Sequence, residues 1–201
     1  MKVILAIDQG TTGTTVAVMN TRGVLLGSVN HEFPQIFPKP GWVEHEPEAI
    51  WKSVLKGIRA VFRKGLCKPA DIACIGITNQ RETALLWERR TGKPVGRAIV
   101  WQCRRTASFC ESLRKKGLEP MVRDRTGLVL DPYFSASKFR WLLNGIEGAR
   151  GRARRGARRC APGSRGARRA ARGGCPRAGA GTSREVARKS SDRLLCVGRT
   201  N

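Results

Sequence analysis

The chain has 201 residues, with 39 Lys and Arg against 15 Asp and Glu, which gives a formal net charge of +24. No stretch approaches the ~20 apolar residues of a membrane span, and the apolar run after Met1-Lys2 stops at Asp8, too soon for a signal peptide. The seven cysteines are odd in number and form no Cys-x-x-Cys pair, which argues against a disulfide framework or a zinc site. We therefore expect a cytoplasmic protein with reduced thiols and no membrane partner.

The first residues predict two strands joined by a tight polar turn. Apolar runs over Val3–Ile7 and Val16–Met19 flank Asp8 and a Gly/Thr stretch from Gly10 to Thr15. Glycines and threonines let backbone N–H groups and hydroxyls converge on an anion, and a neighbouring acid suits Mg²⁺ held through water. An ordinary β-hairpin without a ligand is the alternative, and turn chemistry alone does not decide between the two.

The following segments predict an antiparallel meander covered by a helix. A third strand is expected over Val24–Phe33, followed by a proline-broken surface loop that leaves His45 exposed and not a ligand. Apolar residues at three- and four-residue steps predict a helix over Pro47–Lys64 with one face on the sheet. The members of that apolar stripe are Ile50, Trp51, Val54, Leu55, Ile58, Val61 and Phe62.

A buried strand is expected over Asp71–Thr78, parallel to the first strand because a crossover that contains a helix requires that geometry. The order β-β-β-α-β is the start of an RNase H-like or actin-like half domain. Later patterns predict a strand over Leu85–Glu88, a turn at Thr91-Gly92, a helix over about Thr106–Lys116, a turn at Asp131-Pro132, and a helix from Ser137 that ends near Gly145.

Arg81 and Glu82 follow the parallel strand, at the edge where α/β proteins place ligand groups. A guanidinium donates and a carboxylate accepts, so together they can address adjacent hydroxyls of a polyol. Composition alone favours the alternative, an exposed turn with two solvated charges.

Six segments resemble the glycerol kinases of the FGGY carbohydrate kinase family, which have the actin-like ATPase fold. They are Asp8–Thr12, Pro34–His45, Gly76–Thr83, Ile99–Thr106, Thr126–Ser135 and Arg152–Gly156, and the resemblance runs over about residues 2–156. It implies that the hairpin, with Asp8, Gly10, Thr11, Thr12, Gly13 and Thr14, holds the phosphates of ATP and that Asp8 faces Mg²⁺. It also implies that Arg81, Glu82, Trp101 and Tyr133 bind glycerol, with the indole against its carbon side.

The resemblance implies ATP-dependent phosphorylation of glycerol to sn-glycerol 3-phosphate, in an intact enzyme that is a homo-oligomer. The family's catalytic base lies in a later Gly-Asp-Gln motif, and its adenosine site and second phosphate loop come later still. No catalytic residue is therefore expected in this chain, which we interpret as a truncated, inactive form. Two alternatives are a kinase for another sugar or polyol, and a non-catalytic basic fragment that binds nucleic acid.

The composition changes abruptly after Arg150 and divides the chain into residues 1–150, an incomplete N-terminal kinase domain, and residues 151–201. The second part carries 15 Lys and Arg against 2 Asp and Glu, is rich in Arg, Gly and Ala, and has no aromatic residue. Such a tail cannot bury enough apolar surface to fold, so we expect it to be disordered and to bind polyanions without specificity. A native basic arm, a low-complexity linker and out-of-frame sequence are the three explanations, and the change beside a family match favours the last, with the break near Gly156.

Overall fold

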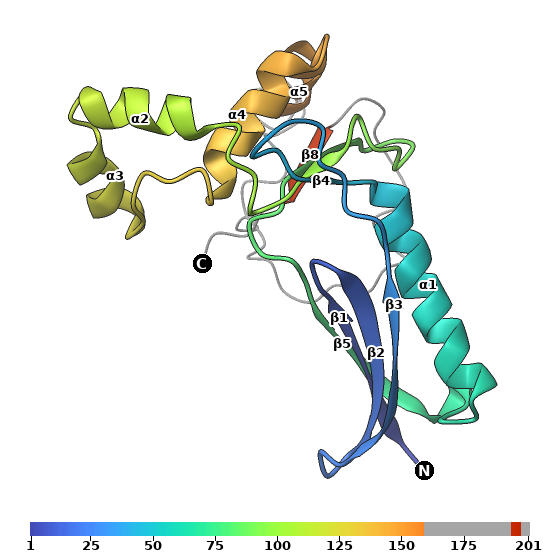
Figure 1. The fold of residues 1–201 in the computed structure, drawn as a ribbon. Helices are drawn as coiled ribbons and strands as arrows, with labels where there is room; N and C mark the ends of the chain where they lie inside the picture. Colours follow the sequence, from blue (N-terminus) through green and yellow to red (C-terminus); the bar gives the residue numbers. More distant parts are fainter. Residues whose placement is uncertain (159–193, 198–201) are drawn as a thin grey trace, which may run out of the picture.

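The computed structural model describes residues 1–158 and 194–197, and its largest element is a four-stranded mixed sheet (Figure 1). The strands are β1 (Val3–Gln9), β2 (Gly13–Asn20), β3 (Leu25–Glu32) and β5 (Ile72–Thr78), in the order β3-β2-β1-β5. The first three form an antiparallel meander, and β5 runs parallel to β1. The predicted β-β-β-α-β start and the parallel direction of β5 are confirmed.

Alternation of side chains along β1 sets the face that the sheet buries. Val3, Leu5 and Ile7 are buried, whereas the residues between them are partly exposed, as the two-residue period of a strand requires. The β2–β3 turn is closed by Asn20, whose Oδ1 accepts from the backbone N–H groups of Arg22 and Val24 at 2.9 Å each. This turn fixes the register of the meander.

Helix α1 (Pro47–Arg63) covers the face of the sheet that β2 and β3 present (Figure 1). Val54, Ile58 and Phe62 pack on the buried residues of the three meander strands. The contact is close, since a Cβ added at Gly57 would lie 2.5 Å from Cγ2 of Val16. Trp51 was predicted to belong to the apolar stripe, but it is 57% exposed, so that part of the prediction is wrong.

The prediction that the fourth strand is buried is also wrong. In β5 only Ile72 is partly covered, and Ile75 and Ile77 are 56% and 73% exposed. The physical reason is position: α1 lies over β2 and β3, and β5 is an edge strand of the described sheet. An apolar run indicates that a strand has the composition of a buried one, but it does not supply the layer that buries it.

A second, smaller core is formed by elements that lie beyond the carboxyl ends of β1 and β5, in the upper part of Figure 1. Two short strand pairs belong to this region: β4 (Glu44–His45) with β7 (Ala98–Ile99), and β6 (Leu85–Glu88) with β8 (Leu194–Val197). Helix α4 (Ser135–Gly145) contributes Leu142 to its core, and a 3₁₀ turn, η1 (Pro69–Asp71), precedes β5. The predicted strand over Leu85–Glu88 and the helix that ends near Gly145 are confirmed.

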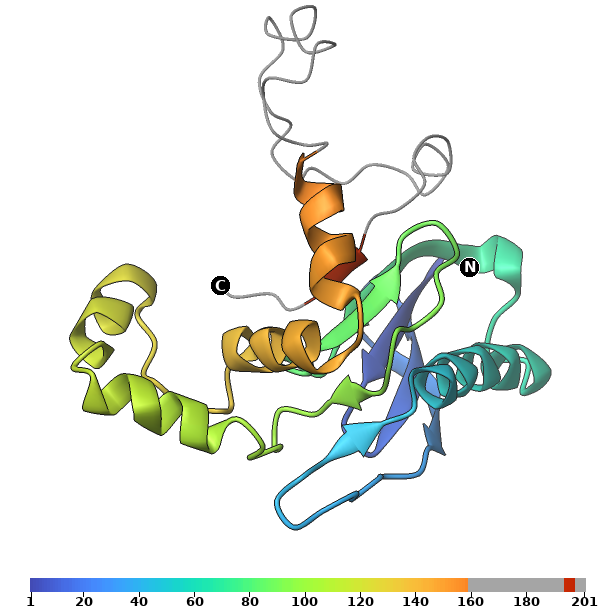
Figure 2. The same cartoon turned by 90° about the horizontal axis from the view of Figure 1, so that it is seen from above.

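Helices α2 (Ala107–Lys115) and α3 (Glu119–Thr126) form an arm on one side of the molecule in both views (Figures 1 and 2). The helix expected over about Thr106–Lys116 is confirmed, whereas α3 was not predicted. Gly127 ends α3 in the left-handed conformation, with φ of 71°, and its N–H bonds to Arg123.

Helix α5 (Ala149–Arg158) runs across Gly151, the residue at which the basic tail is expected to begin. Arginine and alanine are good helix formers, and helical propensity does not depend on the apolar content used to predict disorder. Residues 194–197 also form a strand, β8. The remainder of the predicted tail, 159–193 and 198–201, lies outside the described residues. Among the helices that the structure describes, none is both long and apolar enough to cross a membrane.

Candidate functional site

The Gly/Thr turn between β1 and β2 is held from two sides. The N–H of Gly10 donates to the carbonyl oxygen of Gly13 at 2.9 Å, which closes the turn itself. From outside, Nε2 of Gln35 donates to the carbonyl oxygen of Thr11 at 2.9 Å, and the N–H of Phe33 donates to that of Thr12 at 3.2 Å. With its carbonyl groups bonded in this way, the turn is preorganised around its remaining N–H groups and hydroxyls.

The predicted phosphate-side residues do not all point the same way. Asp8 and Thr12 are exposed at the end of the turn, and Thr11 is partly exposed. Thr14 is fully buried, and its hydroxyl is hydrogen-bonded to that of Ser53 on α1 at 2.7 Å. The Thr14 side chain therefore fastens β2 to the helix, and only its backbone is left to face a ligand.

Gly13 lies close against the backbone of β3. A Cβ on this residue would lie 2.9 Å from the carbonyl oxygen of His31, closer than real side chains approach. The glycine thus serves strand packing as well as the turn.

Trp101 joins the turn to the second core. Its indole N–H donates to the hydroxyl of Thr11 at 2.9 Å, although the two residues are 90 positions apart in the chain. Its ring meets the ring of Tyr133 edge to face, with centroids 5.7 Å apart. Two predicted glycerol residues and one predicted phosphate residue are therefore in one contiguous group.

Glu82 lies beside the same group and has an unusual backbone. Its φ of 64° is in the left-handed region, which residues other than glycine occupy at a cost of order 1–3 kcal/mol. Its Oε2 accepts hydrogen bonds from the N–H of Ser135 at 2.7 Å and from the hydroxyl of Ser135 at 2.6 Å. Because Ser135 begins α4, the carboxylate also meets the positive end of that helix. Arg81, its neighbour, is exposed.

Lys138 is a buried charged residue beside the candidate site that the sequence did not reveal. It is fully buried, and its ammonium group donates to the backbone carbonyl of Tyr133. Burial lowers the pKa of Lys138 to about 8, against a smaller opposing effect of the negative charge on Glu82. A lysine in the sequence Ser-Lys-Phe-Arg looks like an exposed helix residue, so nothing in the pattern pointed to this role.

His45 corrects an expectation, because it is fully buried and not exposed in a loop. It belongs to β4, its Nε2 is hydrogen-bonded to Oε1 of Gln35, and its ring stands edge-on to Phe33 at 5.1 Å. Burial lowers the pKa of His45 to about 4. Since Gln35 also bonds to Thr11, this histidine supports the turn from behind.

Gln80 connects the ends of the parallel strands β1 and β5. Its Nε2 donates to Oε1 of Gln9 at 3.2 Å, and its Oε1 accepts from the hydroxyl of Thr83 at 3.1 Å. The carboxyl ends of β1 and β5 are thus tied together where the predicted ligand groups begin. Among the described residues no cluster of three or more His, Cys, Asp or Glu side chains could hold a metal ion by itself.

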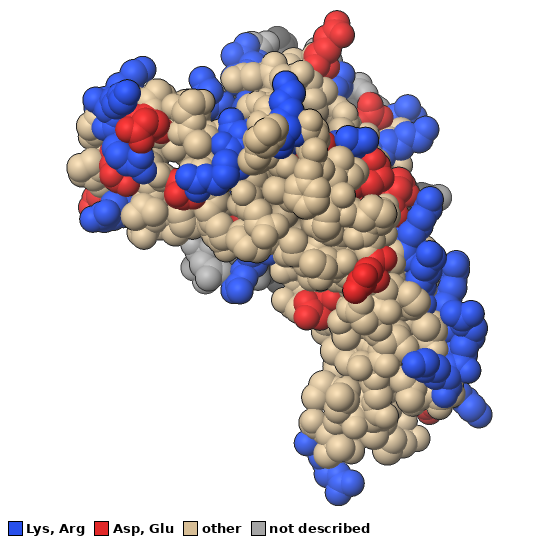
Figure 3. All heavy atoms as spheres, in the orientation of Figure 1, with Lys and Arg blue, Asp and Glu red and all other residues tan. Residues whose placement is uncertain are grey.

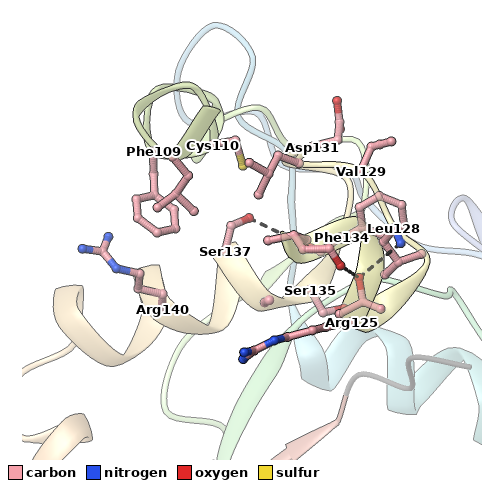
Figure 4. A pocket seen from close by; sticks show the side chains of 15 residues that line it. Phe109, Cys110, Arg125, Leu128, Val129, Asp131, Phe134, Ser135, Ser137 and Arg140 are labelled. Atoms are coloured by element: carbon pink, nitrogen blue, oxygen red, sulfur yellow. Dashed lines mark hydrogen bonds between the residues drawn. The ribbon is translucent and has the colours of Figure 1, made fainter. Parts of the chain in front are cut away.

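A separate cavity of about 560 Å³ lies between α2, α3 and α4 (Figure 4). Its walls are mainly apolar, with Phe109 on one side and Leu128 and Phe134 on the other, and two arginines, Arg125 and Arg140, also line it. It contains none of Arg81, Glu82, Trp101 and Tyr133. This cavity is therefore distinct from the predicted site.

The sheet order, the Gly/Thr turn at the end of β1 and the polar residues beyond β5 define an α/β domain of the actin-like ATPase type. The model of the FGGY family of carbohydrate kinases, N-terminal domain, matches residues 3–157, and the chain belongs to that family.

Within this family, individual glycerol kinases are similar to the chain. The chain is 55% identical to a glycerol kinase of Ralstonia pickettii over 156 residues, and 52% identical to one of Caldanaerobacter subterraneus subsp. tengcongensis over 155 residues. These matches cover 78% and 77% of this chain. A crystal structure of Plasmodium falciparum glycerol kinase with ADP has a TM-score of 0.70 and 34% identity, and the match covers 76% of this chain and 30% of that one. The chain spans about 31% of the length of the curated relatives that it matches.

Proposed function

We propose that this chain is the acceptor-binding and phosphate-binding part of an ATP-dependent glycerol kinase, which forms sn-glycerol 3-phosphate in the cytoplasm. The observation that carries the proposal is the hydrogen bond from Trp101 to Thr11, at 2.9 Å. It joins the wall of the predicted glycerol pocket to the turn predicted to hold the transferred phosphate. Phosphoryl transfer needs acceptor and phosphate side by side, because positioning supplies most of its catalysis.

Each predicted glycerol residue is assigned one kind of contact with the substrate. Both hydrogen bonds from Ser135 end on Oε2 of Glu82, so Oε1 is the carboxylate oxygen left for a substrate hydroxyl. Arg81 donates to a second hydroxyl, and the phenol of Tyr133 to a third. The indole of Trp101 faces the C–H edge of the polyol, for which an aromatic surface is a suitable wall.

The phosphates of ATP are assigned to the turn of Gly10, Thr11, Thr12 and Gly13, with Thr14 contributing through its backbone. Asp8 is exposed beside the turn and fits a Mg²⁺ ion held through water. Such an ion would neutralise charge on the phosphates that the turn binds. The intact enzyme, about three times as long as the matched segment, is proposed to be a homo-oligomer.

A chimera tests the proposal. Residues 1–157 of this chain replace the matching segment of the Ralstonia pickettii glycerol kinase, and ADP formation is measured with glycerol and with a panel of sugars and other polyols. We expect turnover with glycerol at a rate within an order of magnitude of the parent enzyme. Turnover only with another acceptor would show that the chain belongs to a kinase for a different sugar or polyol. A folded chimera without any turnover would contradict the assignment of the site.

A second function is proposed for the basic tail, on the strength of its charge. Residues 151–201 carry 15 Lys and Arg against 2 Asp and Glu, an excess that favours non-specific binding of polyanions. This binding is independent of the kinase site and has its own test below.

A further inference from the structure

Lys138 occupies a position that burial and charge both oppose. Figure 3 shows lysines and arginines gathered on the surface along α1, whereas the side chain of Lys138 is fully buried. It lies in the first turn of α4, where the positive end of the helix repels a cation. Removing an ammonium group from water carries a large penalty unless polar partners replace the water. The partners of Lys138 therefore indicate what this residue does.

Those partners are carbonyl groups of the segment that leads into α4. The ammonium group donates to the carbonyl oxygen of Tyr133, and more weakly to that of Phe134, at 3.5 Å. The N–H of Tyr133 donates in turn to Oδ1 of Asp131 at 2.8 Å. Both polar groups of the Tyr133 backbone are thus held, while its ring stands edge to face against Trp101.

A single peptide group connects Lys138 with Glu82. The carbonyl oxygen of this group, from Phe134, faces Lys138, and its N–H, from Ser135, donates to Oε2 of Glu82 at 2.7 Å. Hydrogen bonds in series polarise one another, so an ammonium group at the oxygen end strengthens the bond at the N–H end. Burial lowers the pKa of Lys138, and the negative charge of Glu82 opposes that shift, so the two charges attract each other. The position of Glu82 is therefore coupled to Lys138.

We propose that Lys138 is a positioning residue for the alcohol that accepts the phosphoryl group. It fixes the backbone of residues 133–135 and thereby places two groups, the phenol of Tyr133 and the carboxylate of Glu82. Lys138 acts through these groups, because its own side chain is fully buried and bonded to the backbone. A displacement of about 1 Å in such groups is enough to cost about a hundredfold in rate. This inference rests on the proposed function, which supplies the contacts of Glu82 and Tyr133 with the polyol.

The first test is a double-mutant cycle in the chimera of residues 1–157, with glycerol and ATP varied separately. Lys138→Met keeps most of the length of the side chain without its charge, and kcat/KM for glycerol should fall about tenfold to a hundredfold with little change in KM for ATP. Tyr133→Phe should lower kcat/KM about fivefold in the unaltered chimera, but less than about twofold beside Lys138→Met, because the phenol is already misplaced. Additive effects would overturn the proposal, since a residue that serves only the fold does not alter what the phenol contributes.

Controls separate positioning from folding. Lys115→Met, at an exposed position on α2, is the matched control and should leave both kinetic constants unchanged. Thermal unfolding checks that each variant is folded. Lys138→Gln, which retains a neutral donor, takes the place of Lys138→Met in the cycle if the latter does not fold. Failure of both variants to fold would show that Lys138 serves the fold, and would overturn the positioning role.

A measurement without turnover distinguishes this inference from the proposed function. In the 201-residue chain, Lys138→Met should speed amide hydrogen exchange at Ser135 about tenfold, because the bond from its N–H to Glu82 is loosened. Exchange at the unaltered rate would overturn the proposal whatever the acceptor is. If exchange responds as expected but the unaltered chimera does not phosphorylate glycerol, the proposed function is wrong and the placement of Glu82 by Lys138 is retained.

Discussion

Glu82 combines a left-handed backbone with a carboxylate bonded to Ser135, and both features are unusual for a residue in a solvated turn. The bonds to the start of α4 offset the backbone cost and hold the side chain in one position. Strain of this kind is typical of functional sites, where the surrounding structure fixes a conformation that a free turn would not choose.

The first prediction concerns this residue in the chimera. Glu82→Ala removes a charge-assisted hydrogen bond worth about 1.5–3 kcal/mol. The kcat/KM for glycerol should therefore fall by roughly tenfold to a hundredfold or more. Tyr133→Phe removes one hydroxyl and should cost on the order of 1 kcal/mol. The KM for ATP should hardly change in either variant, because neither residue belongs to the turn proposed to bind the phosphates.

Steady-state kinetics with glycerol and ATP varied separately make that measurement. Glu147→Ala, at an exposed position beyond α4, serves as the control for loss of a carboxylate. Parent-like glycerol kinetics in Glu82→Ala, or a defect confined to ATP, would show that the polyol site lies elsewhere.

The second prediction concerns His45. Its pKa is about 4 in the folded chain, against 6.5 for an unperturbed histidine, so the unfolded state binds more protons between these limits. Stability that is present above pH 6.5 is therefore lost as the pH falls towards 4, by about 2–3 kcal/mol at pH 4.5. Urea unfolding at about pH 7.5 and about pH 4.5 should show that His45→Gln loses this part of the acid sensitivity. If His45→Gln and the unaltered chain show the same difference in unfolding free energy between the two pH values, the prediction is wrong.

At the scale of elements, the contact between α1 and β2 determines how closely the helix approaches the sheet. Exchange of glycine for alanine within a helix usually stabilises by about 0.5–1 kcal/mol. At Gly57 the added Cβ would lie 2.5 Å from Val16, so overpacking should reverse the sign.

The third prediction is that Gly57→Ala lowers the free energy of unfolding by about 1–3 kcal/mol. The double variant Gly57→Ala, Val16→Ala provides space for the new methyl group and should be more stable than the sum of the two single changes implies. Denaturant titration of all four proteins measures this coupling. Strict additivity would mean that the helix shifts freely and that the contact does not set its position.

The sequence predicted well those elements whose apolar periodicity is strong and local. The meander and α1 agree with their predicted positions to within a few residues. Strand alternation and helical spacing are both local patterns, which depend only on residues close together in the sequence. It predicted poorly where an outcome depends on distant layers: β5 has the composition of a buried strand without the cover, and His45 looks like a loop residue without the residues that enclose it. Helices α3 and α5 have few apolar residues, so their periodicity was too weak to detect.

For the candidate site, too, the sequence predicted the local features and missed those that depend on contacts between distant residues. The spacing of glycines and threonines indicated the turn, but only packing on α1 reveals that Thr14 faces away from it. The nearness of Trp101 to Thr11 could not be read from positions 90 residues apart. Lys138 stayed hidden because its burial depends on its contact with the carbonyl of Tyr133 and on packing near the distant Glu82, which the spacing of neighbouring residues does not show.

For the whole molecule, the fourth prediction is that residues 1–201 alone do not phosphorylate glycerol. The chain spans about 31% of its relatives, so groups that the remaining part supplies are not in it. Incubation with ATP, Mg²⁺ and glycerol should give no more ADP than a boiled sample. Turnover above that control, abolished by Glu82→Ala, would show that the acceptor and phosphate residues suffice.

The fifth prediction concerns the basic part of the chain. The full 201 residues should bind unrelated DNA sequences with similar affinity, and the logarithm of that affinity should fall linearly with the logarithm of the salt concentration. Residues 1–158 alone are the control and should show a much smaller slope. A strong preference for one sequence that persists at high salt would contradict non-specific binding and support the nucleic-acid alternative.

The order of strands in the sheet also sets an order of events while the chain is being made. A ribosome releases the meander and α1 first, and these pair with near neighbours, so they can form before the distant β5 emerges. Thr11 meets Trp101 only after 90 further residues. A nascent chain halted before Trp101 therefore carries the turn proposed to bind phosphate without the indole that borders it, and the proposed wall of the polyol site is completed last.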